Sequence, residues 1–363
     1  MDDATEIVRY TPADRAEVFE LLDRAHPAEL SARLQRQWDW KYEANPFNRD
    51  GEPYLLLWRD GGQIVGMLGV MSVRMCIDGR ERIVGHLCDW SMRPDHRGRR
   101  MARRLLDRQR PDWPVRFAWQ NEISRRLSPG MIGDNSGILR LSPLTRVLAV
   151  GDVIADASGS RLAGRIASAT TMSTCAFLRR LRDRTSVAGV TVEETCGFDD
   201  RFDELWQRAR RDYRVLLVRD RRYLQWRFAE RPDARYRILV AMRGGDLVGY
   251  LVFRELQQDD AGRGYLVDFM VADRSTAVFS QLLSLAIARL EHHGTRWLTC
   301  RVIVPPFRGV LYRHGFLPIR QSVGGYLRSY RPDADTSDMD SRTFVDPRNW
   351  FLTMGDGDLE ISV

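Results

Sequence analysis

Two stretches of the chain carry β-rich apolar runs on either side of a Gly-Gly pair. They read YLLLWRDGGQIVGMLGVMSVRM from Tyr54 and RILVAMRGGDLVGYLVFREL from Arg237. Because adjacent glycines readily supply the positive φ of a tight turn, each stretch is predicted to form an antiparallel hairpin. Further along each half, apolar residues recur at helical spacing over Gly98–Arg110 and Thr276–His292, which predicts a helix after each hairpin.

These elements occur in the same order in both halves of the chain. The segment that begins at Trp40 aligns with the one that begins at Trp226, and the aligned pairs are Trp40 with Trp226, Pro46 with Pro232, Gly61-Gly62 with Gly244-Gly245, and Gly66 with Gly249. A later strand, HLCDWSM or YLVDFMV, places Asp89 in register with Asp268, and a helix, a strand and a short helix follow. Two copies of one α+β unit are therefore predicted.

The length of the chain also favours two domains. With 363 residues, of which 44% are hydrophobic, the chain is too large for one ordinary core. The expected organisation is an N-terminal unit over 1–150, a linker over 151–186, a second unit over 187–332 and a C-terminal tail over 333–363. Within the linker, an amphipathic connecting helix is predicted over 161–184.

Composition narrows the class of protein. No apolar run is long enough to cross a membrane, and the start MDDATEIVRY lacks the basic and then apolar order of a signal peptide, so a cytoplasmic protein is expected. The five cysteines and six histidines show no metal-ligand spacing, and no metal is expected. The net charge of +7 is compatible with nucleic acid, a membrane surface or an anionic cofactor. A basic balance alone is weak evidence for nucleic acid, which is not expected as a partner. The sequence does not indicate an oligomeric state.

The stretch DWSMRPDHRGRRMARRLL, which begins at Asp89, carries the most informative chemistry. It predicts a strand that enters a helix through a glycine-containing turn. The first N–H groups of a helix lack partners within the helix and carry partial positive charge, so such a turn suits a phosphate group.

Together with the Gly-Gly hairpin and the following FAWQNEISRRL, this order of elements resembles the GNAT superfamily of acyl-CoA-dependent N-acyltransferases. The pyrophosphate motif of that superfamily runs Arg/Gln-x-x-Gly-x-Gly/Ala. Arg97, Gly98 and Ala102 match a common form of it, while Arg100 replaces the middle glycine. The internal repeat resembles the tandem members of the superfamily. The resemblance implies a layered α+β fold in which each unit has a mixed, mostly antiparallel sheet flanked by helices.

The resemblance also implies a cofactor, acetyl-CoA or another acyl-CoA. In the superfamily two neighbouring parallel strands separate to admit its pantetheine arm, and strand N–H groups hold the acyl carbonyl. The residues that this assigns to the cofactor are Trp90, Ser91 and Met92 for the acyl group, Arg97, Gly98, Arg99, Arg100, Met101 and Ala102 for the pyrophosphate, and Asn121 for the arm.

The candidate catalytic groups start with Asp89 and His86 on the central strand. They are three residues apart, which places them on opposite faces of a regular strand, although members of the superfamily often have a bulge there. Asp89 is repeated as Asp268. Asp89 is therefore a candidate for a structural or substrate-orienting role as well as for the general base. Glu122 is a further candidate base.

The two units keep different parts of the family signature. The tyrosine that often protonates the departing thiolate matches Tyr312 in GVLYRHGF of the second unit, whereas the first unit has Ser128. The second unit has VADRSTAVFSQLL, without glycine, in place of the pyrophosphate loop. The first unit is therefore expected to bind the cofactor. Tyr42 and Asn45 in WDWKYEANPFN fall where the superfamily places acceptor-binding helices.

The expected function is direct acyl transfer from acyl-CoA to the amine of a small molecule. One alternative is a Fem-type transferase, also tandem, which uses aminoacyl-tRNA and lacks the pyrophosphate loop; Arg100 favours it. The other alternative is a non-catalytic binding protein with the GNAT fold, favoured by Ser128 and by the missing loop of the second unit.

Overall fold

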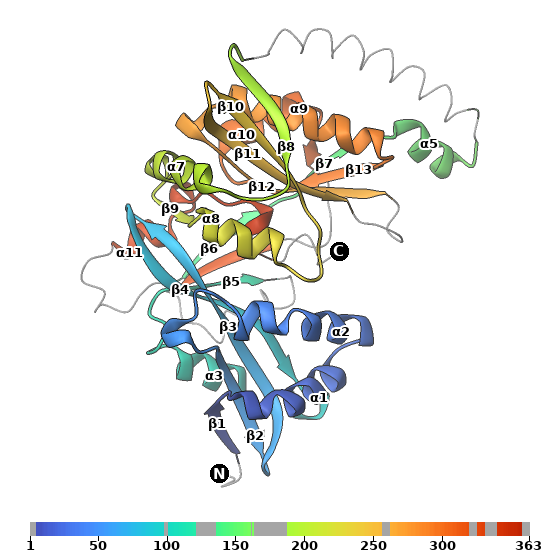
Figure 1. Ribbon diagram of the computed structural model, residues 1–363. Coiled ribbons are helices and arrows are strands. Elements are labelled where there is room, and N and C mark those ends of the chain that lie inside the picture. The colour runs from blue at the N-terminus through green and yellow to red at the C-terminus, as the bar shows by residue number, and fades with distance from the viewer. Residues whose placement is uncertain are drawn as a thin grey trace.

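The computed structural model describes residues 5–97, 101–120, 136–160, 162, 187–255, 262–318, 325–330 and 340–357. It has two mixed sheets, each flanked by helices, which confirms the predicted α+β class with two units (Figure 1). The two sheets lie one above the other in Figure 1, and the C-terminal end of the described chain lies between them. The predicted connecting helix over 161–184 lies outside the described residues, except for Leu162.

The first sheet has eight strands among the described residues. Seven follow one another across the sheet in the order β1 (Thr5–Arg9), β2 (Tyr54–Asp60), β3 (Gln63–Ile77), β4 (Arg80–Met92), β5 (Arg116–Gln120), β15 (Gly325–Tyr330) and β6 (Ser136–Leu141). The eighth, β9 (Val215–Leu217), pairs with β3. The pair β4–β5 is parallel, and the other pairs described in this sheet are antiparallel.

The second sheet repeats this plan, with seven strands in the part of the chain that the structure describes. Their order is β14 (Leu317–Pro318), β7 (Leu144–Val147), β13 (Trp297–Cys300), β12 (Arg263–Val271), β11 (Asp246–Glu255), β10 (Arg237–Arg243) and β8 (Val190–Thr195). The parallel pair is β12–β13, the counterpart of β4–β5. Both predicted Gly-Gly turns are present, since Gly61, Gly62, Gly244 and Gly245 all have positive φ.

The two sheets exchange strands. β15, from the second half of the chain, lies between β5 and β6 of the first sheet. β7, from the first half, lies between β14 and β13 of the second sheet. The unit predicted over 1–150 therefore contributes one strand to the second sheet, and the unit predicted over 187–332 contributes two, β9 and β15, to the first. Separating the units would break main-chain hydrogen bonds in both sheets.

Helices cover both faces of the sheets. Their bounds are α1 (Arg15–Ala25), α2 (Ala28–Arg36), α3 (Met101–Gln109), α5 (Val150–Ser158), α7 (Asp200–Ala209), α8 (Arg221–Leu224), α9 (Thr276–His292), α10 (Pro305–Arg313) and α11 (Ser341–Val345). α9 has the predicted bounds, and α3 lies within the other predicted helix. Among the helices described, none has the length and apolar character needed to span a membrane.

Strand β2 shows how the first unit is layered. Leu55 and Leu57 share a buried cluster with α1, whereas Leu56 and Trp58 share another with Leu105 of α3. Because successive side chains of a strand point to opposite faces, α1 and α3 lie on opposite faces of the first sheet.

The two copies of the internal repeat contact each other through two tryptophans. The rings of Trp40 and Trp226 are stacked, with centroids 4.8 Å apart and an interplanar angle of 17°. Trp40 Nε1 donates to the carbonyl oxygen of Trp226 at 2.8 Å, and Trp226 Nε1 donates to that of Trp40 at 3.1 Å. Each lies in a π-helical turn, Asp39–Glu43 or Gln225–Ala229. Such reciprocal contacts are typical of a two-fold relation, and they confirm that the two tryptophans are equivalent positions of the repeat.

A double-mutant cycle should detect this contact between the units. We expect Trp40→Phe and Trp226→Phe to be coupled by about 1–2 kcal/mol, because stacking and two buried hydrogen bonds are lost together. The measurement is urea unfolding of the two single variants, the double variant and the wild type. Trp113→Phe with Trp226→Phe is the control, because Trp113 belongs to a different buried cluster and its change should add independently. Additive effects of the Trp40 and Trp226 changes would contradict the expectation.

Candidate active site

Strand β4 carries a bulge at the point where β5 leaves it. The β4–β5 ladder ends at the pair Leu87–Ala118. On the other side, Cys88 pairs with Gly69 but Ser91 pairs with Met67, so β4 holds one extra residue there. Asp89, in the bulge, has a φ of 49°. The edge of β4 from Cys88 to Met92 is therefore not paired with β5, and the spacing of a regular strand does not apply to His86 and Asp89.

The side chain of Asp89 is held by two residues of the first π-helical turn. Lys41 Nζ lies 3.0 Å from Oδ1 and 2.9 Å from Oδ2, and the Tyr42 hydroxyl donates to Oδ2 at 2.7 Å. Lys41, the only lysine of the chain, has a side chain that is 2% exposed. A buried ammonium group is costly unless it is paired, so the turn and the bulge stabilise each other. With both oxygens engaged, Asp89 is an anchor of the bulge.

Burial keeps the Tyr42 hydroxyl protonated. Desolvation, reinforced by the nearby Asp89 and Cys88, raises the pKa of Tyr42 well above its usual value. The hydroxyl reaches the bulge because Gly69 on β3 has no side chain, and a Cβ there would collide with it. Tyr42, predicted to contact the acceptor, thus contacts Asp89.

Besides Lys41, His26 is a residue at this site that was not predicted from the sequence. It follows the last residue of α1, and its Nε2 lies 2.7 Å from Ser91 Oγ on β4. Ser91 is buried, and its hydroxyl also donates to the carbonyl oxygen of Asp89 at 3.4 Å. If Ser91 donates to Asp89, it accepts the proton of Nε2, which makes Nδ1 the basic nitrogen of His26.

The surroundings of His26 favour its neutral form. Burial lowers the pKa of its imidazole below the usual value, Arg97 acts in the same direction, and Asp89 opposes them. The only local sign in the sequence was the pair His26-Pro27 at a helix end, and nothing in it pointed to a strand 65 residues away. Among the described residues, Nδ1 of His26 has no hydrogen-bond partner.

We expect the pKa of the His26 imidazole to lie below 6.5, the unperturbed pKa of histidine. Since the folded-state pKa is lowered, the stability tied to neutral His26 is present above about pH 6.5 and is lost as the pH falls through the lowered pKa. Two-dimensional NMR of the histidine side chains would measure this. Arg97→Gln should raise the pKa of His26, because it removes a nearby positive charge. A His26 pKa above 6.5 in the wild type would contradict the expectation.

The other predicted catalytic residues lie in different surroundings. His86 is buried, and its ring stacks on Phe117 with centroids 4.7 Å apart. Tyr312 on α10 is 44% exposed, and its hydroxyl accepts from Arg308 at 3.0 Å. Glu122 lies outside the described residues.

The residues predicted to bind cofactor and acceptor are only partly described. Trp90 is 39% exposed at the bulge, while Ser91 is buried. Met101 and Ala102 begin α3, and the predicted contacts Gly98, Arg99, Arg100 and Asn121 lie outside the described residues. Asn45 is buried and caps its own turn, donating to the carbonyl oxygen of Ser72 at 3.0 Å and accepting from the Phe47 N–H at 2.9 Å.

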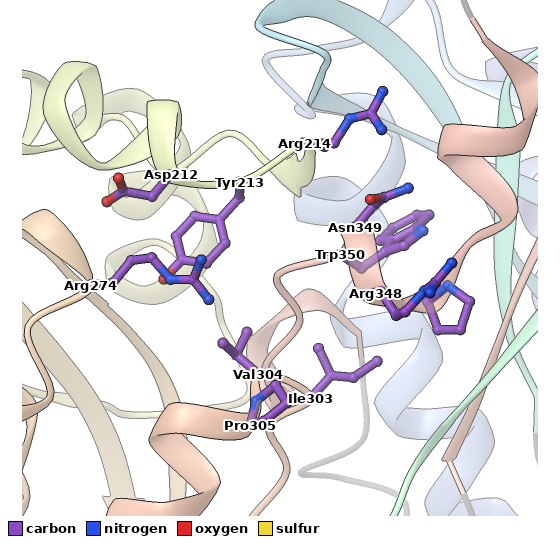
Figure 2. Close-up of a pocket in the computed structure, with 11 residues that line it drawn as sticks. Asp212, Tyr213, Arg214, Arg274, Ile303, Val304, Pro305, Arg348, Asn349 and Trp350 are labelled. Atoms are coloured by element: carbon purple, nitrogen blue, oxygen red, sulfur yellow. The ribbon is translucent and has the colours of Figure 1, made fainter.

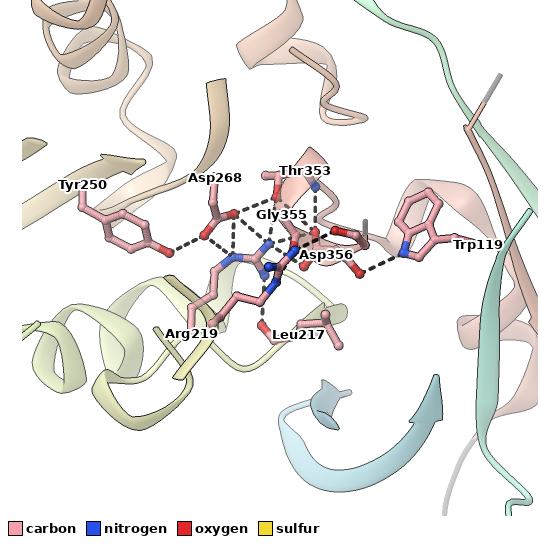
Figure 3. A network of polar contacts seen from close by, with 10 residues as sticks. Trp119, Leu217, Arg219, Tyr250, Asp268, Thr353, Gly355 and Asp356 are labelled. Atoms are coloured by element: carbon pink, nitrogen blue, oxygen red, sulfur yellow. Dashed lines mark hydrogen bonds and ion pairs between the residues drawn. The ribbon is translucent and has the colours of Figure 1, made fainter. Parts of the chain in front are cut away.

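The second unit places a buried ion network at the corresponding position (Figure 3). Asp268 accepts from the Tyr250 hydroxyl at 2.7 Å and from Arg219 Nη2 at 3.1 Å. Arg219 Nη2 also lies 2.7 Å from Asp356 Oδ1, and its side chain is 1% exposed. Burial alone lowers the pKa of Arg219, but the two carboxylates outweigh it and hold that pKa well above its usual value.

The C-terminal segment fills the gap between β12 and β13. Thr353 forms a bridge with Val302 and donates to Asp268 at 2.7 Å. Trp119 of β5 donates to the carbonyl oxygen of Asp356 at 2.8 Å, which ties this segment to the first unit as well. The cavity that remains beside Asp268 measures about 10 Å³.

Side chains also occupy the rest of this region in the second unit. The rings of Phe269, Phe279 and Phe307 pack against one another, with centroids 4.2 to 5.2 Å apart. At the start of α9, the hydroxyl of Ser275 accepts from the N–H of Val278, so a side chain of the chain itself caps this helix. The second unit thus holds its own residues at the place where the described residues of the first unit leave a strand edge unpaired.

The known proteins that resemble this chain share its fold. Residues 6–116 match the family model of the acetyltransferase (GNAT) domain. No curated protein sequence matches the chain significantly. The first unit therefore resembles that domain in sequence, as predicted.

Solved structures match nearly the whole chain. A probable N-acyltransferase of Enterococcus faecalis V583 is 9% identical with a TM-score of 0.54, over 90% of this chain and 72% of that one. A GCN5-related N-acetyltransferase of Kribbella flavida is 15% identical with a TM-score of 0.55, over 90% and 71%. Saccharomyces cerevisiae N-myristoyltransferase with bound myristoyl-CoA is 12% identical with a TM-score of 0.53, over 91% and 83%. The chain thus has the GNAT fold in two units.

Proposed function

We propose that this protein is an acyl-CoA-dependent N-acyltransferase whose first unit transfers the acyl group of acetyl-CoA, or of another acyl-CoA, directly to the amine of a small molecule. The observation that carries the proposal is the bulged β4, whose edge from Cys88 to Met92 is not paired with β5 and lies beside His26. This edge belongs to the region that matches the acetyltransferase domain. The myristoyl-CoA bound to the yeast N-myristoyltransferase supports the class of cofactor.

The residues at this edge fit an acyl-CoA, which when bound would supply a thioester already activated for attack by an amine. The N–H groups along Trp90, Ser91 and Met92 would hold the acyl carbonyl and stabilise the negative charge that develops on its oxygen. The turn that the sequence predicts from Arg97 to Ala102 would hold the pyrophosphate ahead of α3. The first unit is the better candidate, because the C-terminal segment and aromatic side chains fill the corresponding place in the second.

Within the first unit, His26 is the base that we propose for the acceptor amine. Its lowered pKa leaves the imidazole neutral near pH 7, and Ser91 holds the ring by Nε2, which leaves Nδ1 to take the proton. The role of Asp89, with Lys41 and Tyr42, is to hold the bulge that positions Ser91. His86 and Glu122 remain alternative bases and Tyr312 a candidate acid.

The first test is calorimetric titration of the full chain with acetyl-CoA and with longer acyl-CoAs. Micromolar binding that Gly98→Glu abolishes would support the cofactor site, because a carboxylate in the turn repels pyrophosphate. Arg100→Gly, which restores the family motif, should bind at least as tightly as the wild type. Release of free CoA with a panel of amines then tests the transfer itself.

Two outcomes would overturn the proposal. Binding of acyl-CoA without turnover on any amine would favour the non-catalytic binding protein. No binding of acyl-CoA by the wild type or by Arg100→Gly, together with salt-sensitive binding of tRNA, would favour the Fem-type transferase.

A further inference from the structure

A cavity of about 580 Å³ lies where the two units meet, at the end of α2. Arg36, the last residue of α2, lines it from the first unit, and the segment from Pro232 to Arg237 lines it from the second. Gln37 Nε2 donates to Asp233 Oδ2 at 2.5 Å and joins the two units beside it. His26 precedes α2, whose nine residues span about 13 Å, so this cavity and the β4 bulge lie at opposite ends of one helix.

The two carboxylates of this cavity are already paired. Asp233 lies 2.7 Å from Arg231 Nε, in a pair whose side chains are at most 5% exposed. Glu255 lies 3.7 Å from both Arg237 and His293. Asp233 is therefore engaged by a neighbouring arginine, whereas Oε1 of Glu255 is buried without a hydrogen-bond partner among the described residues.

Three arginines in the lining have no carboxylate partner among the described residues: Arg36, Arg235 and Arg254. Arg254 has the greatest need of a partner, since its Nε and Nη1 are buried and have no hydrogen-bond acceptor in the part of the chain that the structure describes. Its guanidinium lies 5.7 Å from the centre of the Tyr236 ring, a cation–π contact that provides no hydrogen-bond acceptor for these N–H groups. Buried donors without partners cost free energy, and like charges around one cavity repel.

We propose that this cavity binds the oxyanion group of a small molecule, a phosphate monoester or a polycarboxylate, with Arg254 as the principal contact. Two N–H donors of one guanidinium match two oxygens of a phosphate or carboxylate group. Arg36 and Arg235 add positive charge from the two sides of the cavity, one from each unit. The volume is that of an ordinary small-molecule pocket. The proposed site is separate from the one proposed for acyl-CoA and does not depend on it.

The test is calorimetric titration of the whole 363-residue chain with inorganic phosphate, pyrophosphate and citrate. It is made in the Gly98→Glu variant, so that the turn of the first unit does not contribute. We expect saturable binding that Arg254→Gln weakens at least about tenfold and that Arg235→Gln weakens less, because one charge-assisted pair is removed from the centre and one from the rim. Stronger binding of the phosphates or of citrate then identifies the chemistry of the natural ligand.

A second cavity provides the matched control (Figure 2). It measures about 380 Å³ and is lined by Arg214, Arg274 and Arg348, of which Arg348 is paired with Asp346 at 2.6 Å. Arg348→Gln removes the same charge as Arg254→Gln and should leave anion binding within about twofold of the starting value. Equal losses in both variants would overturn the proposal, since only net charge would matter, and so would the absence of saturable binding up to about 10 mM. Arg254→Gln should unfold at the same temperature as its parent or higher when no anion is present, which separates lost binding from misfolding.

Discussion

Replacing His26 by alanine should lower kcat/KM for acyl transfer by about 10²- to 10⁴-fold, the range that a positioned general base contributes. The expected loss follows from the contact of His26 with Ser91 at the bulge and from its lowered pKa, which keeps the imidazole neutral near pH 7. Steady-state release of CoA with the best amine of the panel measures it. Calorimetry should show that the His26→Ala variant still binds acyl-CoA.

The pH profile separates a base from a merely structural residue. In the wild type, kcat/KM should fall as the pH drops through the lowered pKa of His26, below about 6.5. This acidic limb should disappear in His26→Ala. Ser91→Ala should keep the limb and lose less activity, because Ser91 orients the ring and takes no proton. An unchanged kcat/KM in His26→Ala would move the role of base to His86 or Glu122.

Replacing Arg219 by leucine should destabilise the protein by about 3–5 kcal/mol, the cost of removing one partner from a buried ion pair. Arg219 lies between two carboxylates, 3.1 Å from Asp268 and 2.7 Å from Asp356, and all three side chains are at most 2% exposed. Without the guanidinium, two buried negative charges would face each other. Urea unfolding at pH 7 measures the loss.

Two companion experiments attribute this loss to the network. Arg348→Leu removes an exposed cation that is paired with Asp346, and should change the free energy of unfolding far less than Arg219→Leu does. Burial and the neighbouring Asp268 raise the pKa of Asp356 even in the wild type, against the effect of Arg219. In Arg219→Leu that opposition is lost, so the variant should regain stability relative to the wild type as the pH falls and the carboxyl groups take up protons. A cost below about 1 kcal/mol at pH 7 would show that the network contributes little.

The network also links stability to the first unit. The segment that carries Asp356 contacts Trp119 on β5, and Arg227, which follows Trp226 in the second π-helical turn, donates to the carbonyl oxygens of Gly355 and Gly357. The ion pair Lys41–Asp89 in the first unit and the ion pair Arg219–Asp268 in the second thus have the same role. In each, a carboxylate at the point where two parallel strands part needs a buried cation.

The candidate site was predictable only in part. The strand that carries Asp89 and Ser91, and the helix that begins at Met101, follow from local patterns and from the family motif. The roles of individual side chains did not follow from these patterns. Tyr42 and Asn45, which were predicted to bind the acceptor, form hydrogen bonds to Asp89 and Ser72. Lys41 offered one signal that could have been used: a single lysine in an arginine-rich chain suggests a place where arginine does not fit.

The sequence by itself determined the hairpins, the amphipathic helices and the repeat, because these depend on turn residues and periodicities within a few tens of residues. Only the tertiary structure decided the strand exchange, the contact of His26 with Ser91 over 65 residues, and the pairing of Arg219 with Asp356 over 137 residues. The reason is physical. The partner of a buried polar side chain depends on which groups lie next to it after the sheets have packed and water is excluded. The periodicity of the sequence contains no information about that position.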